Sequence, residues 1–111
     1  MKLSHQDYAH VTVLTLSGDY TSEDVEPFNR AIAERLDAGV RDFVIDCEHL
    51  EFIDSAALEA LLRLRDRASE KSGHLRLVNP DPNVLKILEI TRLDRAFQAH
   101  SSLEAAVKSL R

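Results

Sequence analysis

Short runs of apolar and β-branched residues alternate along this chain with longer segments in which apolar residues recur every three or four positions. Runs of the first kind predict strands, and segments of the second kind predict amphipathic helices. A helix between two strands acts as a crossover, so this order predicts an α/β fold with a mixed, mostly parallel sheet and about four helices. The predicted strands are residues 3–7, 11–16, 43–45, 75–78 and 97–100.

Residues that favour helix ends set the expected boundaries. Asp24 is the expected N-cap of the first helix, which places Pro27 in the first turn, and Gly39 is expected to end that helix. A short loop is expected at residues 48–51. The other expected boundaries are Ser55 and Gly73 for the second helix, Asp81 with Pro82 for the third, and a Ser101–Glu104 capping box for a last helix running to Leu110.

Charge and composition restrict the function classes. The chain has 111 residues, a length that predicts one domain over residues 1–111. Its net charge of −5 predicts that this acidic domain does not bind nucleic acid. The densest basic run, Arg63 to Arg67, is interrupted by Asp66 and predicts a solvated helix face. Cys47 has no partner for an internal disulfide, and no stretch approaches the roughly 20 apolar residues that span a bilayer. We expect a cytoplasmic protein without membrane insertion.

Catalytic and metal-binding patterns are missing from the sequence. Its three glycines form no phosphate-binding loop, and its histidines show no ligand spacing such as H-x-x-x-H. No candidate nucleophile has a residue nearby in the sequence that could act as its general base. The sequence therefore predicts a protein that is not an enzyme and that uses no cofactor or metal.

The most informative stretch is Phe52 to Leu62, where Asp54 and Ser55 stand at the start of the second predicted helix. One interpretation is structural, because Asp or Ser at this position commonly caps a helix. The other is regulatory: a helix N-terminus accommodates a phosphate on Ser55, which would add a charge of about −1.5 to −2. Local chemistry alone favours simple capping.

The order Phe-Ile-Asp-Ser-small-small-Leu-x-x-Leu, between an apolar strand and an amphipathic helix, resembles the STAS domain of bacterial anti-sigma factor antagonists. Gly18-Asp19 resembles the Gly-acidic turn of that family. Residues 82–97 resemble its third helix and return strand, and residues 102–106 its last helix. The resemblance extends in order over essentially the whole chain, and it favours the regulatory interpretation of Ser55.

The resemblance implies a binding module that captures an anti-sigma factor, itself a serine kinase. Phosphorylation of Ser55 would end the capture, and a separate serine phosphatase would restore it. Ser55 is thus a substrate and not a catalyst. The partner-binding residues carried over from the family are Asp19, Thr21, Asp54, Ser55, Ala56 and Glu59.

The chain departs from the family pattern close to Ser55. Glu59 stands one turn later where the family usually has glycine, and like charges at this spacing oppose each other by ~0.2–0.5 kcal/mol. Arg63, one further turn along, is expected to neutralise part of that charge. The other departures are Ala57 and Arg92 in place of glycine and Thr21 in place of aspartate.

Two alternative functions stay open at this point. The chain could be a constitutive cytoplasmic STAS subunit of a membrane ABC lipid-transport complex, in which the motif surface packs permanently against an ATPase. It could also be a STAS scaffold protein in stress signalling.

Overall fold

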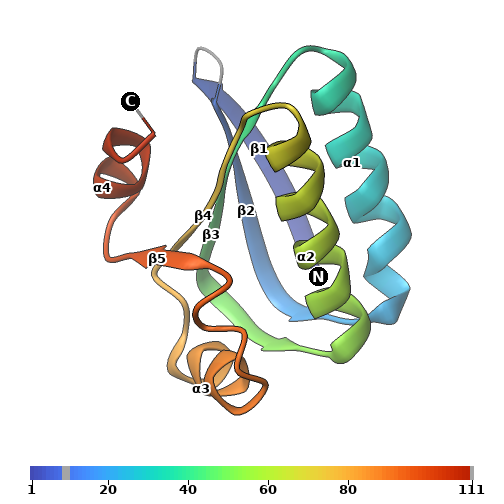
Figure 1. Ribbon diagram of the computed structural model, residues 1–111. Coiled ribbons are helices and arrows are strands. Elements are labelled where there is room, and N and C mark those ends of the chain that lie inside the picture. Colours follow the sequence, from blue (N-terminus) through green and yellow to red (C-terminus); the bar gives the residue numbers. More distant parts are fainter. Residues whose placement is uncertain (9–10, 111) are drawn as a thin grey trace.

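The computed structural model, which describes residues 1–8 and 11–110, is a five-stranded sheet covered by helices (Figure 1). The strand order is β1-β2-β3-β4-β5, with β1 antiparallel to β2 and every other neighbouring pair parallel. The α/β class and the mixed, mostly parallel sheet are therefore confirmed. The elements are β1 Lys2–Tyr8, β2 Val11–Tyr20, the 3₁₀ helix η1 Ser22–Asp24, α1 Val25–Asp37, β3 Asp42–Ile53, α2 Ser55–Glu70, β4 Leu75–Val78, α3 Pro82–Ile90, β5 Gln98–His100 and α4 Leu103–Lys108.

The helices divide between the two faces of the sheet. The parallel crossovers all advance the chain by one strand in the same direction, and such crossovers are right-handed, so α1 and α2 lie on one face. Figure 1 shows α4 on the opposite face. The larger core lies under α1 and α2 and includes Phe28, Ile32, Leu61 and Leu64. A smaller cluster under α4 consists of Val11, Val13, Val44, Val78 and Ala106.

Strand β3 is longer than the sequence predicts. It continues through residues 48–51, so the loop expected there is wrong. The pairing of β2 with β3 shifts register twice, between Thr15 and Ser17 and between Gly18 and Asp19. These bulges break the in–out alternation that identifies a strand in a sequence. Strand β2 continues past Gly18 to Tyr20, which pairs with Ile53, so β2 and β3 end side by side at one edge of the sheet.

One of the expected caps is confirmed in position and another is wrong. Asp24 is the N-cap residue of α1, as predicted, but its carboxylate makes no capping hydrogen bond and instead accepts a 3.0 Å hydrogen bond from the Thr21 N–H. The expected Ser101–Glu104 capping box is wrong, because the hydroxyl of Ser102, and not that of Ser101, accepts from the N–H of Ala105 at 3.1 Å. The Asp81 cap is confirmed, since its carboxylate accepts from Asn83 N–H at 2.8 Å.

Gly73 does not end α2 in the way the sequence predicts. The helix ends at Glu70, and the left-handed residue after it is Ser72, with φ of 61°. Gly73 donates its N–H to Ala68 O at 2.7 Å and lies directly against the backbone of Arg41. A close approach of two backbones, and not a left-handed turn, therefore requires glycine here.

Arg92→Gly is expected to raise the free energy of unfolding by about 0.5–1 kcal/mol. Arg92 has φ of 61°, where a Cβ costs ~1–2 kcal/mol, and this exceeds the ~0.4–1 kcal/mol of extra unfolded-state entropy that glycine brings. Chemical denaturation measures the change, with Arg92→Ala as the control that removes the same charge but keeps Cβ. Equal stabilities of the two variants would contradict the assignment of strain to this position.

Candidate functional site

The carboxyl ends of β2, β3 and β4 lie at one edge of the sheet, where the chain enters η1, α2 and α3 (Figure 1). In sheets of this kind, the edge formed by the carboxyl ends of the strands is the usual place for binding sites. We define the switch edge as the part of this edge formed by the ends of β2 and β3, by Thr21 with the start of η1, and by Asp54 with the first two turns of α2. It contains all six candidate site residues: Asp19, Thr21, Asp54, Ser55, Ala56 and Glu59.

Asp54 joins three segments of the switch edge. Its Oδ1 accepts from the N–H of Ala57 at 2.9 Å and so caps α2, and its Oδ2 accepts from the N–H of Ser22 on η1 at 2.8 Å. Its own N–H donates to Tyr20 O at the end of β2 at 3.1 Å. Asp54 is thus the structural cap that the sequence allows for, and it also fixes the loop after β2 against the start of α2.

Ser55 is the first residue of α2, and it is exposed. Because Asp54 supplies the cap, the Ser55 hydroxyl is not needed for it, and it makes no hydrogen bond within the described residues. The first N–H groups of a helix have no acceptor inside the helix, and the helix dipole is positive at this end. The position is therefore open to a phosphorylating enzyme and favourable for the added negative charge.

The face of α2 opposite Ser55 is anchored in the core. Ala57 and Leu58, in the first turn, are buried, and Ala57 has no exposed surface at all. Alanine at this family glycine position therefore fills space under the helix and leaves the outer surface unchanged. A group added to Ser55 would alter that outer surface without disturbing the packing beneath it.

The charged neighbours of Ser55 are arranged as follows. Glu59 is exposed and forms the expected ion pair with Arg63, with 2.9 Å between Glu59 Oε1 and the guanidinium. Asp19 is exposed at the end of β2. Thr21 is half-buried, and hydrogen bonds from its N–H and hydroxyl are the main reason that the pKa of Asp24 is held below its usual value. That these residues contact a partner stays a prediction.

Phe52 belongs to the same edge but is not among the residues predicted for the site. Its side chain is 45% exposed, and it stands opposite Asp19 in the register of β3 with β2. An exposed aromatic ring beside polar groups is typical of interaction surfaces. A register shift lies between Gly18 and Asp19, next to this pair, and it is not visible in the sequence, so the sequence gives no signal for the exposure of Phe52.

Tyr20 lies beneath the switch edge. Its ring is fully buried against Phe28, with 5.1 Å between ring centroids, and its hydroxyl has no partner within the described residues. Burial, reinforced by the nearby carboxylates of Asp24 and Asp54, raises the pKa of Tyr20 well above its usual value. The ring thus stays neutral and supports the edge from the core side.

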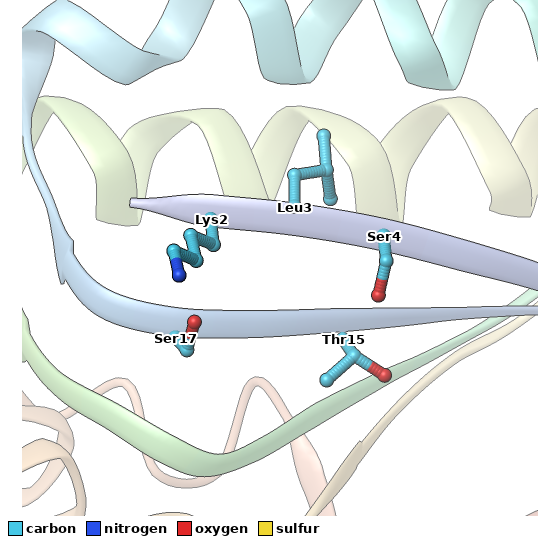
Figure 2. Close-up of a pocket in the computed structure, with 5 residues that line it drawn as sticks. All are labelled: Lys2, Leu3, Ser4, Thr15 and Ser17. Atoms are coloured by element: carbon cyan, nitrogen blue, oxygen red, sulfur yellow. The ribbon is translucent and has the colours of Figure 1, made fainter.

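A hollow of about 440 Å³ lies between β1 and β2, lined by Lys2, Leu3, Ser4, Thr15 and Ser17 (Figure 2). Leu3 projects toward the helices, whereas Lys2 and Ser4 project to the other side of the sheet. No residue of the switch edge lines this hollow, so it does not contribute to the candidate site.

The remaining candidates for reactive chemistry have structural roles. Cys47 is 1% exposed, and burial, helped by the charge of Asp46, raises the pKa of its thiol to about 12. Cys47 is thus a small buried apolar residue of the core. Within residues 1–8 and 11–110, no group of three His, Cys, Asp or Glu side chains is placed to hold a metal ion. In the same residues, no helix has the length and apolar character needed to cross a bilayer.

Comparisons with known proteins match this geometry. The family model described as STAS domain matches residues 2–106. A Bordetella bronchiseptica protein described as a candidate anti-sigma factor antagonist is 28% identical over 111 residues, which cover 100% of this chain and 96% of that protein. The crystal structure of a candidate anti-sigma factor antagonist from Thermotoga maritima aligns with a TM-score of 0.90 at 22% identity, over 98% of this chain and 94% of that chain. The phosphorylated form of the Bacillus cell fate determinant SpoIIAA aligns with a TM-score of 0.78 at 20% identity, over 99% and 100%.

Proposed function

The chain belongs to the STAS domain family, and on this premise we propose that it is an anti-sigma factor antagonist whose binding is switched off by phosphorylation of Ser55. The observation that carries the proposal is the division of roles at the start of α2. Asp54 caps the helix, and the Ser55 hydroxyl is left exposed without a hydrogen-bond partner in the described chain. The description of the Bordetella bronchiseptica relative as a candidate anti-sigma factor antagonist supports the general role.

The unmodified switch edge would be the binding surface. Phe52 offers an exposed apolar ring, while Asp19, Asp54 and Glu59 make the surrounding surface acidic. An anti-sigma factor that docks here would therefore present a basic surface around an apolar contact. Complementary charge of this kind raises the association rate and selects the partner.

Phosphorylation would reverse the interaction through charge. A phosphate adds about −1.5 to −2 charges and three acceptor oxygens at the centre of the contact. The free N–H groups of the first turn of α2 stabilise that phosphate, so the domain stays folded while the interface loses affinity. In the proposed cycle the anti-sigma factor is itself the serine kinase, and a separate serine phosphatase regenerates the binding form.

The experiment that tests the assignment is phosphorylation in vitro. The chain is incubated with its cognate anti-sigma factor and ATP, and the modified residue is identified by mass spectrometry. We expect one phosphate, on Ser55, that is lost in Ser55→Ala and retained in Ser22→Ala, which removes the neighbouring exposed hydroxyl of the same edge. Full labelling of Ser55→Ala would contradict the proposal.

Glu59→Gln is expected to accelerate phosphorylation of Ser55 by up to about twofold. The glutamate stands one turn from Ser55, where like charges oppose each other by ~0.2–0.5 kcal/mol, and its ion pair with Arg63 already offsets part of this repulsion. Both side chains of the pair are more than half exposed, so the gain should shrink as salt screens them.

The measurement for Glu59→Gln is the initial rate of phosphate incorporation at low and high salt. Glu34→Gln is the matched control, because it removes an exposed carboxylate from the last turns of α1, away from the switch edge. A rate unchanged from that of Glu34→Gln would show that Arg63 and solvent cancel the charge completely. Loss of partner binding in Glu59→Gln would instead make Glu59 a direct contact.

A further inference from the structure

A second polar surface feature lies away from the switch edge, in a cleft between α2, the start of β4 and the loop that precedes β5. The cleft has a volume of about 210 Å³. We call it the arginine cleft, because three arginines contribute to its lining: Arg65 of α2, Arg76 of β4 and Arg95 of the loop. Ser69 and His74 add further polar groups to the lining.

Two of the three arginines are held in place by their neighbours. Arg65 donates to Ala96 O at 3.4 Å and to the carboxylate of Asp66 at 3.3 Å. Arg76 donates from Nε to the Ser109 hydroxyl and from a terminal nitrogen to Leu75 O, each at 3.2 Å. A guanidinium has five N–H donors, so both groups are positioned and still have donors to spare.

Arg95 is the least restrained of the three. It is exposed, and within residues 1–8 and 11–110 it forms neither an ion pair nor a hydrogen bond. It also lines an adjoining hollow together with Arg92 and Asp94. Arg95 therefore stands at the junction of two depressions with all of its donors available.

The charge of this region contrasts with that of the whole protein. The chain carries a net charge of −5, yet three arginines meet at one small cleft. The carboxylates that bear on it are Asp66, already paired with Arg65, Asp42, bonded to His74 Nδ1 at 3.2 Å, and Asp94 in the adjoining hollow. That hollow also contains Arg92, so four arginines stand against three aspartates and the local charge is positive.

We propose that the arginine cleft binds a phosphoryl dianion. Its volume is below the roughly 300–1,000 Å³ of pockets that enclose whole small molecules, so it suits a single anionic group. Planar guanidinium forks match the oxygens of phosphate, and the arginines of the cleft and of its adjoining hollow outnumber the aspartates beside them. The Ser69 hydroxyl can donate one further hydrogen bond.

The arginine cleft and the switch edge can be occupied independently. Arg65 follows Ser55 by ten residues of α2, which corresponds to ~15 Å along the helix axis. Ser69 lies one turn further from Ser55. The phosphoryl group bound here could be carried by a free phosphate or by a phosphoserine side chain of a protein, since both present the same dianion.

The test is a titration of the unphosphorylated chain, first with inorganic phosphate and then with a short phosphoserine peptide, followed by NMR of the arginine Nε–H signals. Saturable shifts of Arg65, Arg76 and Arg95 are expected for one or both ligands. Tighter binding of the peptide identifies a protein-borne phosphoryl group, and equal or tighter binding of inorganic phosphate identifies the free ion. Signals that shift equally at all arginines, or do not saturate, overturn the proposal.

Arginine variants distinguish a specific phosphate-binding site from general electrostatic attraction. Arg95→Gln and Arg65→Gln should each weaken phosphate binding by about tenfold, because each removes charge-assisted hydrogen bonds. Arg30→Gln is the matched control, since it removes one exposed arginine that is paired with Glu26 on α1. Arg95 is an exposed loop residue without a bond in the described chain, so Arg95→Gln should fold normally. Equal weakening in Arg30→Gln and Arg95→Gln would show screening by net charge alone and overturn the site.

Discussion

Ser55→Glu is expected to weaken binding of the anti-sigma factor by about 2–5 kcal/mol, roughly 30-fold or more, whereas Ser55→Ala should bind like the unmodified chain. The glutamate places a desolvated, unpaired charge in the contact, next to the acidic groups of the switch edge. Removing the hydroxyl costs little, because Asp54 supplies the cap of α2. In addition, kinase and ATP should not abolish binding of the anti-sigma factor by Ser55→Ala.

Calorimetry measures both affinities, and Ser101→Glu is the matched control. Ser101 is exposed and lies between β5 and α4, outside the switch edge, so its replacement adds the same charge away from the proposed contact. Equal affinities of Ser55→Ala and Ser55→Glu would argue for the alternative hypothesis of a constitutively bound subunit. In that hypothesis the motif surface packs permanently against an ATPase. A similar loss in Ser101→Glu would show that net charge alone controls binding.

Gly73→Ala is expected to lower the free energy of unfolding by about 3 kcal/mol or more, which places it among the most damaging single-methyl changes that this chain allows. The new Cβ would lie 2.6 Å from the carbonyl carbon of Arg41 and closer still to its oxygen. These are backbone atoms, so no side chain can rotate away. Asp42 next to them is bonded to the N–H of His74 at 2.9 Å, which ties the start of β3 to the start of β4.

Thermal and chemical denaturation measure the effect, and the expected fall in Tm is roughly 10 °C or more. Gly39→Ala provides the comparison. Gly39 has φ of 93°, but a Cβ at this position would meet no atom within 4 Å, so only backbone strain of ~1–2 kcal/mol should appear there. If Gly73→Ala were no worse than Gly39→Ala, the close approach of the two backbones would not be a determinant of stability.

The order of the elements and the buried helix faces could be predicted because they follow from local pattern. Ala57, Leu61, Leu64 and Ala68 recur at helical spacing, and the structure buries all four. The extension of β3 could not be predicted in this way, because two register shifts replace strict alternation there. The role of Gly73 was equally hidden, since it depends on Arg41, which is more than thirty residues away in the sequence.

The candidate site was predicted to a similar degree. The pairing of Asp54 with Ser55 at a helix start is a local feature, and the sequence identifies it, although only the family resemblance favours the regulatory role of Ser55. The bond from Ser22 N–H to Asp54 is not visible in the sequence, because the two residues are 32 positions apart. The exposure of Phe52 depends on the irregular end of the sheet, which no short-range pattern indicates.

The contacts of Asp54 also bear on how this surface opens. One carboxylate accepts from the 3₁₀ helix after β2 and from the first turn of α2, so neither segment can fray without losing a bond that the other shares. Segments linked in this way open as one cooperative unit and not as two independent ones. A docking partner would therefore encounter a surface in which both segments are folded or one in which both are locally unfolded. Its binding would be coupled to a single local folding equilibrium.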